Sequence, residues 1–130
     1  WKLKESIKTL LVDLGHEVLD CGTMSGESVD YPDFAVAVAA AVAGKKCDRG
    51  VLCCGTGIGM AMTANKTQGI RAAVCQDEYT AEFSRRHNDA NVLCLGARVL
   101  SLDRARKLTR IWMDAKFDAG RHQARVNKIG

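Results

Sequence analysis

Aromatic residues and long apolar runs are scarce in this sequence, and each scarcity disfavours a class of protein. Aromatic residues make up only 5% of the 130 residues, and no nucleic-acid-binding motif accompanies them, which disfavours nucleic acid as a ligand. No apolar run is long enough to span a membrane, and residues 1–5 begin an amphipathic pattern rather than a signal peptide. We therefore expect a cytoplasmic protein with neither a membrane nor a nucleic-acid partner.

Cysteine patterns that bind metals are also missing. The six cysteines form no C-x-x-C pair, and none stands at zinc-finger spacing from a histidine, so zinc and thioredoxin chemistry are disfavoured. Most of them lie in or beside apolar segments, where a free cysteine behaves as a small hydrophobic residue. Cys54 differs, because it follows an apolar run and opens a glycine-rich stretch.

The remaining pattern is an alternation of helices and strands. The length and a hydrophobic fraction of 47% suffice for one domain over residues 1–130. Apolar spacing predicts a helix from Leu3 to Leu14, and a helix capped by Asp30 that runs to Gly44. Further helices are predicted at 58–66, 78–87 and 103–117, and strands at 17–21, 49–53, 70–75 and 91–95.

The predicted strands indicate the fold. Residues 51–54 and 92–95 are continuous apolar runs, which is typical of parallel strands covered on both faces. We therefore predict an α/β fold, a three-layer α/β/α sandwich with a Rossmann-like parallel sheet. Because the sequence opens inside a helix without an initiating Met, we also expect that a first strand is missing ahead of residue 1. In such sheets ligands bind beyond the carboxyl ends of the strands.

Residues 54–59, reading CGTGIG, occupy such a position between a strand and a helix. Alternating glycines let backbone N–H groups converge on an anion, and a thiol at a helix N-terminus is stabilised as the thiolate. The stretch is neither a Walker loop nor a dinucleotide fingerprint, because it lacks the lysine of the first and the third glycine of the second. A tight strand-to-helix turn without a ligand is the alternative.

Two further segments carry candidate groups. His87 follows a predicted helix whose Tyr79 and Phe83 are expected to face inward, and the alternative is that His87 only caps this helix. Arg121 and Arg125 lie on one helical face and are suited to grip a phosphate, unless they are a solvated basic tail. The net charge of +4 is concentrated in the last quarter of the chain, which favours a small phosphorylated ligand.

Together these segments resemble the ribose-5-phosphate isomerase B family of sugar-phosphate isomerases. The resemblance covers essentially the whole chain through short motifs in a specific order. The motifs are ESVDYPD at 27–33, CGTGIG at 54–59, ANK at 64–66, GIRAA at 69–73, HNDAN at 87–91, GAR at 96–98 and GRH at 120–122. The family interconverts aldose and ketose phosphates, typically ribose 5-phosphate and ribulose 5-phosphate, without metal or cofactor.

The resemblance implies a role for individual residues. Cys54 would move a proton between C1 and C2, and His87 would open the sugar ring with Thr56 assisting. An enediolate oxygen would be held by backbone N–H groups of the loop, from Gly55, Gly57, Ile58 and Gly59. Asn88 would hold a substrate oxygen, and the phosphate would be bound across a dimer interface by Arg98, Arg121 and Arg125. Tyr31 is a candidate for the pocket wall, with a packed helix start as the alternative.

The resemblance also implies an assembly and includes two departures. The family suggests a homodimer, with tetramers left open, and we expect Trp112 and the C-terminal segment at the interface. Another branch of the family places a glutamate base where this chain has Met60. Because Met60 cannot act as a base, the assignment of this role to Cys54 is strengthened. The family begins with a strand ending in an Asp-His pair that this sequence lacks, so a chain that begins at Trp1 is expected to show weak or absent activity and poor stability.

Several alternatives remain open at this stage. A hexose 6-phosphate isomerase of the same family, acting on allose or galactose phosphate, would share the chemistry. The galactose enzymes pair two unlike chains, so the presence of Cys54, His87 and Arg121 in one chain favours a homo-oligomeric pentose phosphate isomerase. A non-catalytic phosphate-binding module would not need the Cys54 thiol. A redox sensor based on Cys53 and Cys54 is disfavoured, because adjacent cysteines on a strand point to opposite faces.

Overall fold

The fold is built from helices and strands that alternate along most of the chain. The computed structural model describes residues 2–21 and 31–130, and the side chains of all of these except Tyr31 and Pro32. The elements are α1 (Lys2–Asp13), α2 (Tyr31–Ala43), β1 (Gly50–Cys54), α3 (Ile58–Ala64), β2 (Ala72–Val74), α4 (Glu78–Arg86), β3 (Val92–Gly96), α5 (Leu102–Asp114) and α6 (His122–Ile129). The predicted cap at Asp30 lies outside the described residues.

The three strands form one parallel sheet in the order β1-β3-β2. Gly50 pairs with Val92 and Cys54 with Gly96, so β1 and β3 begin and end together. Strand β2 pairs with the other side of β3, starting at Ala72 opposite Val92. The carboxyl ends of all three strands therefore point to the same edge of the sheet.

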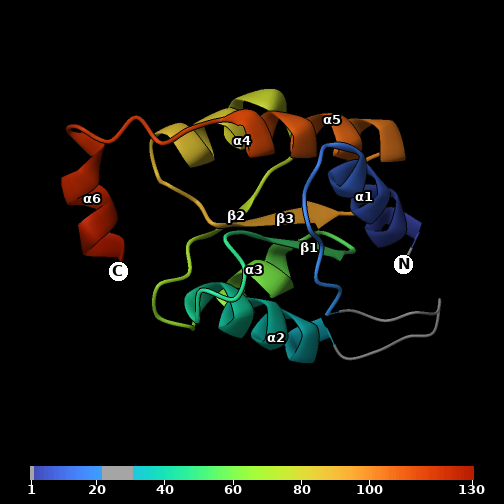
Figure 1. The fold of residues 1–130 in the computed structure, drawn as a ribbon, viewed down its shortest axis with the longest axis horizontal. Helices are drawn as coiled ribbons and strands as arrows, with labels where there is room; N and C mark the ends of the chain where they lie inside the picture. Colours follow the sequence, from blue (N-terminus) through green and yellow to red (C-terminus); the bar gives the residue numbers. More distant parts are fainter. Residues whose placement is uncertain (1, 22–30) are drawn as a thin grey trace.

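Helices cover both faces of this sheet, as the apolar strands predicted. Figure 1 shows α2 and α3 on one face and α1, α4 and α5 on the other. Alternate residues of β3 supply the two cores: Leu93 and Leu95 pack with α1, α4 and α5, whereas Val92 and Cys94 pack with α2 and α3. The prediction of a three-layer α/β/α sandwich is confirmed. Among the described residues, no helix has both the length and the apolar character needed to cross a bilayer.

The strand predicted at residues 17–21 is not present. Residues 16–21 carry no strand pairing, and β1 pairs only with β3 in the part of the chain that the structure describes. A groove of about 1620 Å³, lined by residues 15–21, α1, α2 and β1, separates this segment from the sheet. Instead, Lys4 and Lys8 of α1 bind the Asp20 carboxylate at 3.1 and 3.3 Å. A strand requires a neighbouring strand, and within the described parts of the chain no strand pairs with residues 17–21.

The C-terminal part of the chain also differs from the prediction. Helix α5 starts after Ser101, whose hydroxyl accepts the Arg104 N–H at 3.1 Å, but it ends at Asp114 rather than at residue 117. Ala115 has the extended backbone that ends the helix. The separate helix α6 then begins at His122, and Figure 1 shows it beside the end of the sheet where β3 begins.

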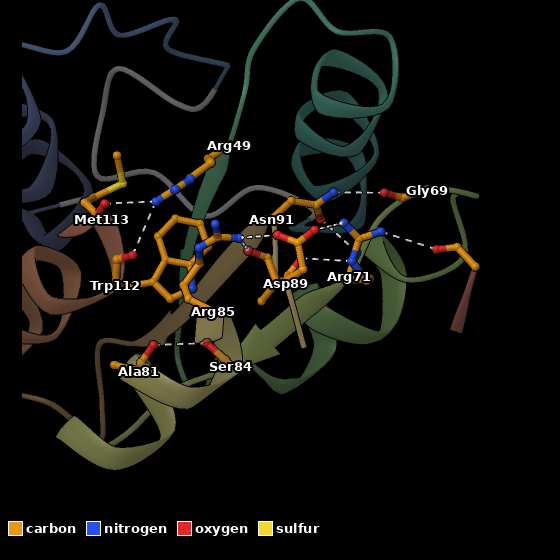
Figure 2. Close-up of polar contacts among 12 residues, drawn as sticks. Arg49, Gly69, Arg71, Ala81, Ser84, Arg85, Asp89, Asn91, Trp112 and Met113 are labelled. Atoms are coloured by element: carbon orange, nitrogen blue, oxygen red, sulfur yellow. Dashed lines mark hydrogen bonds and ion pairs between the residues drawn. The ribbon is translucent and has the colours of Figure 1, made fainter. Parts of the chain in front are cut away.

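Trp112 of α5 is a core residue and not an interface residue. Its side chain is fully buried, which contradicts the expectation that it lies at a subunit interface. Figure 2 shows the indole between the guanidinium groups of Arg49 and Arg85, which lie 5.4 and 5.8 Å from the ring centroid. Arg49 also donates to the backbone oxygens of Trp112 and Met113 at the end of α5. Trp112 thus joins α5 to α4 and to the start of β1.

Candidate active site

Cys54 is the last residue of β1 and opens the glycine loop. Its Sγ accepts the backbone N–H of Gly57 at 3.1 Å, so the loop folds back over the sulfur. Gly57 has φ +84°, a left-handed conformation that glycine adopts without strain and that directs this N–H toward the sulfur. The glycine loop, residues 55–57, therefore holds a half-buried thiol beside backbone donors.

The end of β3 supports this loop. The Ala97 N–H donates to the Cys54 carbonyl at 2.6 Å, and the Arg98 N–H donates to the Gly55 carbonyl at 2.9 Å. A Cβ atom added to Gly55 would lie 3.4 Å from Arg98 Cδ, so the Arg98 side chain runs along the loop. Thr56 Oγ1 accepts the Ile58 N–H at 3.3 Å, which links the loop to α3. The structure thus brings Cys54, Thr56 and Arg98 together at the carboxyl edge of the sheet.

The residues after the glycine loop turn toward the core. Gly59 lies in the first turn of α3, where its carbonyl accepts the Thr63 hydroxyl at 2.9 Å. Met60 is only 5% exposed and belongs to the core between the sheet and α2, so it is a packing residue. Ile58, by contrast, is half exposed on the outer side of α3.

The thiols beside Cys54 occupy apolar surroundings. Burial raises the pKa of Cys53 to about 12 and that of Cys94 to about 12. Cys53 packs with the core below α1 and α5, whereas Cys54 packs with the core of α2 and α3. The two adjacent thiols therefore lie on opposite faces of the sheet, as the strand alternation predicted.

His87 lies in a column of rings at the end of α4. As the C-cap of this helix, it donates its N–H to the Phe83 carbonyl at 2.9 Å. Its ring centroid lies 4.6 Å from that of Phe83 and 4.2 Å from that of His122, with the two imidazoles 13° from parallel. The imidazole of His87 is thus held between two rings, one from α4 and one from α6.

The inward orientation predicted for Tyr79 is wrong, since this side chain is 69% exposed. Ala81 and Arg85 form the buried face of α4, so the row containing Tyr79, Phe83 and His87 lies beside that face rather than on it. Phe83 is half-buried and contacts the rings on both sides. The aromatic residues at helical spacing therefore form a row of contacting rings that ends at His87, and they are not the core-facing side of α4.

Basic side chains surround the second histidine of this column. Arg121 has helical backbone angles directly before α6, so Arg121 and Arg125 lie one helical turn apart, and both are exposed. Burial, followed by the charges of His87 and Arg121, lowers the pKa of His122 below its usual value. Asn88 is exposed immediately after His87. The side chain of Tyr31 lies outside the described residues.

The candidate residues fall into two groups at opposite edges of the sheet. Cys54 is the last residue of β1 and Arg98 follows the carboxyl end of β3, whereas His87 precedes the amino end of β3. In Figure 1, the C-terminal end of α4 and all of α6 lie at the end of the sheet where the β3 arrow begins. One chain alone therefore does not bring Cys54 close to His87.

His122 and Asp118 are polar residues that sequence reasoning left without a role. With His87 they form a cluster whose potential metal-ligand atoms all lie within 4.8 Å of one another. The Asp118 carboxylate is already bound by Arg86 at 3.2 Å, and the two histidine rings are stacked on each other. The position of His122 directly after Arg121 in the basic segment was the only sequence signal for it.

Comparison with known proteins identifies the family. The model of the ribose/galactose isomerase family matches residues 1–129. The chain is 50% identical over 127 residues to ribose-5-phosphate isomerase B of Escherichia coli K12, covering 98% of this chain and 85% of that protein. It is 44% identical over 129 residues to D-erythrulose-4-phosphate isomerase of Pectobacterium atrosepticum, covering 98% of this chain and 85% of that protein.

A solved structure agrees with the sequence comparisons. Ribose-5-phosphate isomerase B of Clostridium thermocellum superimposes with a TM-score of 0.97 at 53% identity, over 99% of this chain and 87% of that chain. The parallel sheet, the covering helices and the position of the glycine loop thus belong to a known architecture. The chain belongs to the ribose/galactose isomerase family and is a sugar-phosphate isomerase.

Proposed function

We propose that this protein interconverts ribose 5-phosphate and ribulose 5-phosphate through an enediolate, with Cys54 as the base. The observation that carries the proposal is the Cys54 sulfur at the end of a strand, 3.1 Å from the Gly57 amide nitrogen. This N–H is a fixed backbone donor beside the sulfur that would take the proton. The similar proteins from Escherichia coli and Clostridium thermocellum are named ribose-5-phosphate isomerase B, which supports the pentose phosphate as the substrate.

The reaction begins with opening of the sugar ring. His87 donates a proton to the ring oxygen, the C1–O4 bond breaks, and the proton of the C1 hydroxyl leaves to solvent or a second group. The product of this step is the open-chain aldehyde. Thr56 assists from the glycine loop, and the exposed Asn88 beside His87 holds a substrate oxygen.

Isomerisation of the open chain needs a base and a site for negative charge. The Cys54 thiolate takes the proton from C2, a C1–C2 double bond forms, and the negative charge moves to the C1 oxygen. Backbone N–H groups of residues 55–59 stabilise this enediolate, since fixed donors aimed at developing charge lower the barrier. Transfer of the C2 hydroxyl proton to the C1 oxygen, and return of the proton from Cys54 to C1, give the ketose and regenerate the thiolate. No oxidant or reductant is required.

We further propose that the complete site forms between two chains. Cys54 and Arg98 at one edge of the sheet would meet His87, Arg121 and Arg125 from the opposite edge of a partner. Most homo-oligomers have a two-fold axis, and such an axis would give each dimer two identical sites of this kind. The exposed guanidinium groups of Arg121 and Arg125 are free to bind the phosphate from the partner's side, in a bidentate manner.

The experiment that tests the base is conversion of ribose 5-phosphate to ribulose 5-phosphate, followed by absorbance. We expect Cys54→Ala to lose at least about 10²-fold in kcat, the lower range for removal of a positioned base. Cys53→Ala is the matched control, because its thiol lies on the other face and its burial raises its pKa to about 12. Equal activity of the parent and Cys54→Ala would contradict the proposed mechanism.

A second candidate function is isomerisation of another aldose phosphate. The relative from Pectobacterium atrosepticum is named for the four-carbon sugar D-erythrulose 4-phosphate, and the family description includes galactose. The same base and loop would serve these substrates, since only the length of the sugar chain changes. Conversion of allose 6-phosphate or erythrose 4-phosphate with higher kcat/KM than ribose 5-phosphate would favour this alternative. A non-catalytic phosphate-binding module would convert none of them.

A further inference from the structure

The loop that follows His87 is fixed by an unusual set of charged contacts. Asp89 has φ +50°, a left-handed conformation that a non-glycine residue rarely adopts, and its backbone N–H still bonds to the Arg85 carbonyl at 3.1 Å. Its carboxylate accepts from Arg85 Nη1 at 2.9 Å and from Arg71 Nη2 at 3.4 Å. Figure 2 shows this carboxylate between the two guanidinium groups.

Each of the two arginines also holds the backbone of this loop. Arg85, which is only 6% exposed, donates to the Ala90 carbonyl at 2.5 Å. Arg71 Nε donates to the Asp89 carbonyl at 2.8 Å, and its backbone N–H donates to the Asn91 side chain, also at 2.8 Å. The loop 87–91 is thereby attached both to α4 and to the chain entering β2.

Arg71 reaches the C-terminal helix as well. Its Nη1 lies 3.4 Å from the Gly130 carbonyl, directly after α6. No α6 residue belongs to either core cluster, as far as the described residues extend, so polar and ring contacts add to the burial of Val126 in holding this helix. The stacking of His87 on His122 is one of those contacts, and it requires α4 and α6 to keep a fixed distance.

We propose that Asp89 and Arg71 are positioning residues that hold His87 in the orientation needed for ring opening. This inference rests on the proposed role of His87. The carboxylate joins the end of α4 to the start of β2, and Arg71 extends the connection to the end of α6. Removal of either group would release the loop and tilt the His87 imidazole, while Cys54 at the opposite edge of the sheet would keep its surroundings.

A pair of substrates separates this role from a general structural one. Ribose 5-phosphate closes into a furanose ring and needs ring opening. Erythrose 4-phosphate cannot form a furanose, because its C4 oxygen carries the phosphate, but it still needs proton transfer between C1 and C2. A defect confined to His87 should therefore lower the rate for the first substrate and spare the second.

The test compares Asp89→Ala and Arg71→Gln with the parent on both substrates. We expect kcat on ribose 5-phosphate to fall at least about 10-fold, which is less than the whole rate acceleration that a positioned general acid supplies. We expect kcat on erythrose 4-phosphate to change less than about 2-fold. Arg104→Gln is the control: its ion pair with Glu78 also involves α4, but at the other end of the helix. Equal loss on both substrates, or no loss on ribose 5-phosphate, would overturn the proposal.

Two further measurements keep the outcome decisive. His87→Ala shows whether ring opening depends on His87: equal loss on both substrates would refute that part of the proposed function instead. The NMR signals of the imidazole Hε1 protons, of which the chain has three, report the stacking without any substrate. We expect Arg71→Gln, which keeps the partner of buried Arg85, to shift the His87 and His122 signals and not that of His16. Unchanged signals would refute the positioning role.

Discussion

Two inactive variants should restore activity to each other if the site is shared between chains. Strand β3 runs from Val92 to Gly96, so four residue steps of about 3.3 Å separate its ends by roughly 13 Å. Cys54 is paired with the last residue of β3 and His87 precedes the first, whereas each must approach its own substrate atom to about 3 Å. Since the ring oxygen is bonded to C1, next to C2, one sugar cannot contact both groups of a single chain.

The assay mixes Cys54→Ala with His87→Ala and measures conversion of ribose 5-phosphate. In a two-fold symmetric dimer of one chain of each kind, one site has both groups and the other has neither, so activity should be about half that of the parent dimer. Random exchange of subunits makes about half of the dimers mixed, which predicts about a quarter of the parent activity for the mixture.

Co-expression with two different affinity tags isolates the mixed dimer and removes the uncertainty of exchange. The control is a mixture of Cys54→Ala carrying one tag with Cys54→Ala carrying the other, which should stay inactive. Mixed dimers that are no more active than either variant would refute the shared site. In that case Cys54 and His87 act in one chain, or one of them has no catalytic role.

Three further predictions concern the fold that supports the site. A Cβ at position 96 would lie 2.8 Å from the backbone carbonyl of Thr56, so Gly96→Ala should displace the glycine loop, destabilise the protein by about 1–3 kcal/mol and lower kcat, measured by urea unfolding and the isomerase assay. Burial raises the pKa values of Cys53 and Cys94 from 9.0 to about 12, which favours the neutral thiols in the folded state. The resulting stability should therefore be fully present below about pH 9 and fall as the pH rises toward 12, measured by urea unfolding. The fall should be smaller in the Cys53→Ala, Cys94→Ala double variant. Trp112→Ala removes a fully buried indole from between two guanidinium groups and should cost about 3–5 kcal/mol of unfolding free energy, whereas an unchanged urea midpoint would contradict its place in the core.

Sequence patterns predicted the elements that depend on local order. The continuous apolar strands at residues 51–54 and 92–95 correctly indicated a parallel sheet covered on both faces. The glycines after Cys54 correctly placed a loop at a strand end, because glycine spacing and a following helix are local features. The pattern at residues 17–21 was misleading, since strand formation depends on a neighbour that local sequence does not reveal.

Periodicity also failed where a helix has more than one apolar row. Tyr79 and Phe83 stand at helical spacing, but the core of α4 is formed by Ala81 and the aliphatic part of Arg85, and the aromatic row leads to His87. A long arginine that is only 6% exposed is not recognised by a count of apolar residues. Its burial is possible because Asp89 and the Ala90 carbonyl bind the guanidinium group.

The sequence alone therefore determined the family resemblance, the layers of the fold and the chemical types of the site residues, because these follow from local patterns and motif order. Only the tertiary structure decided where those residues stand relative to one another. The parallel strands send Cys54 and Arg98 to one edge of the sheet, and the helix returning from β2 carries His87 to the other. That separation follows from the direction of the chain through the layers, and spacing along the sequence does not specify it.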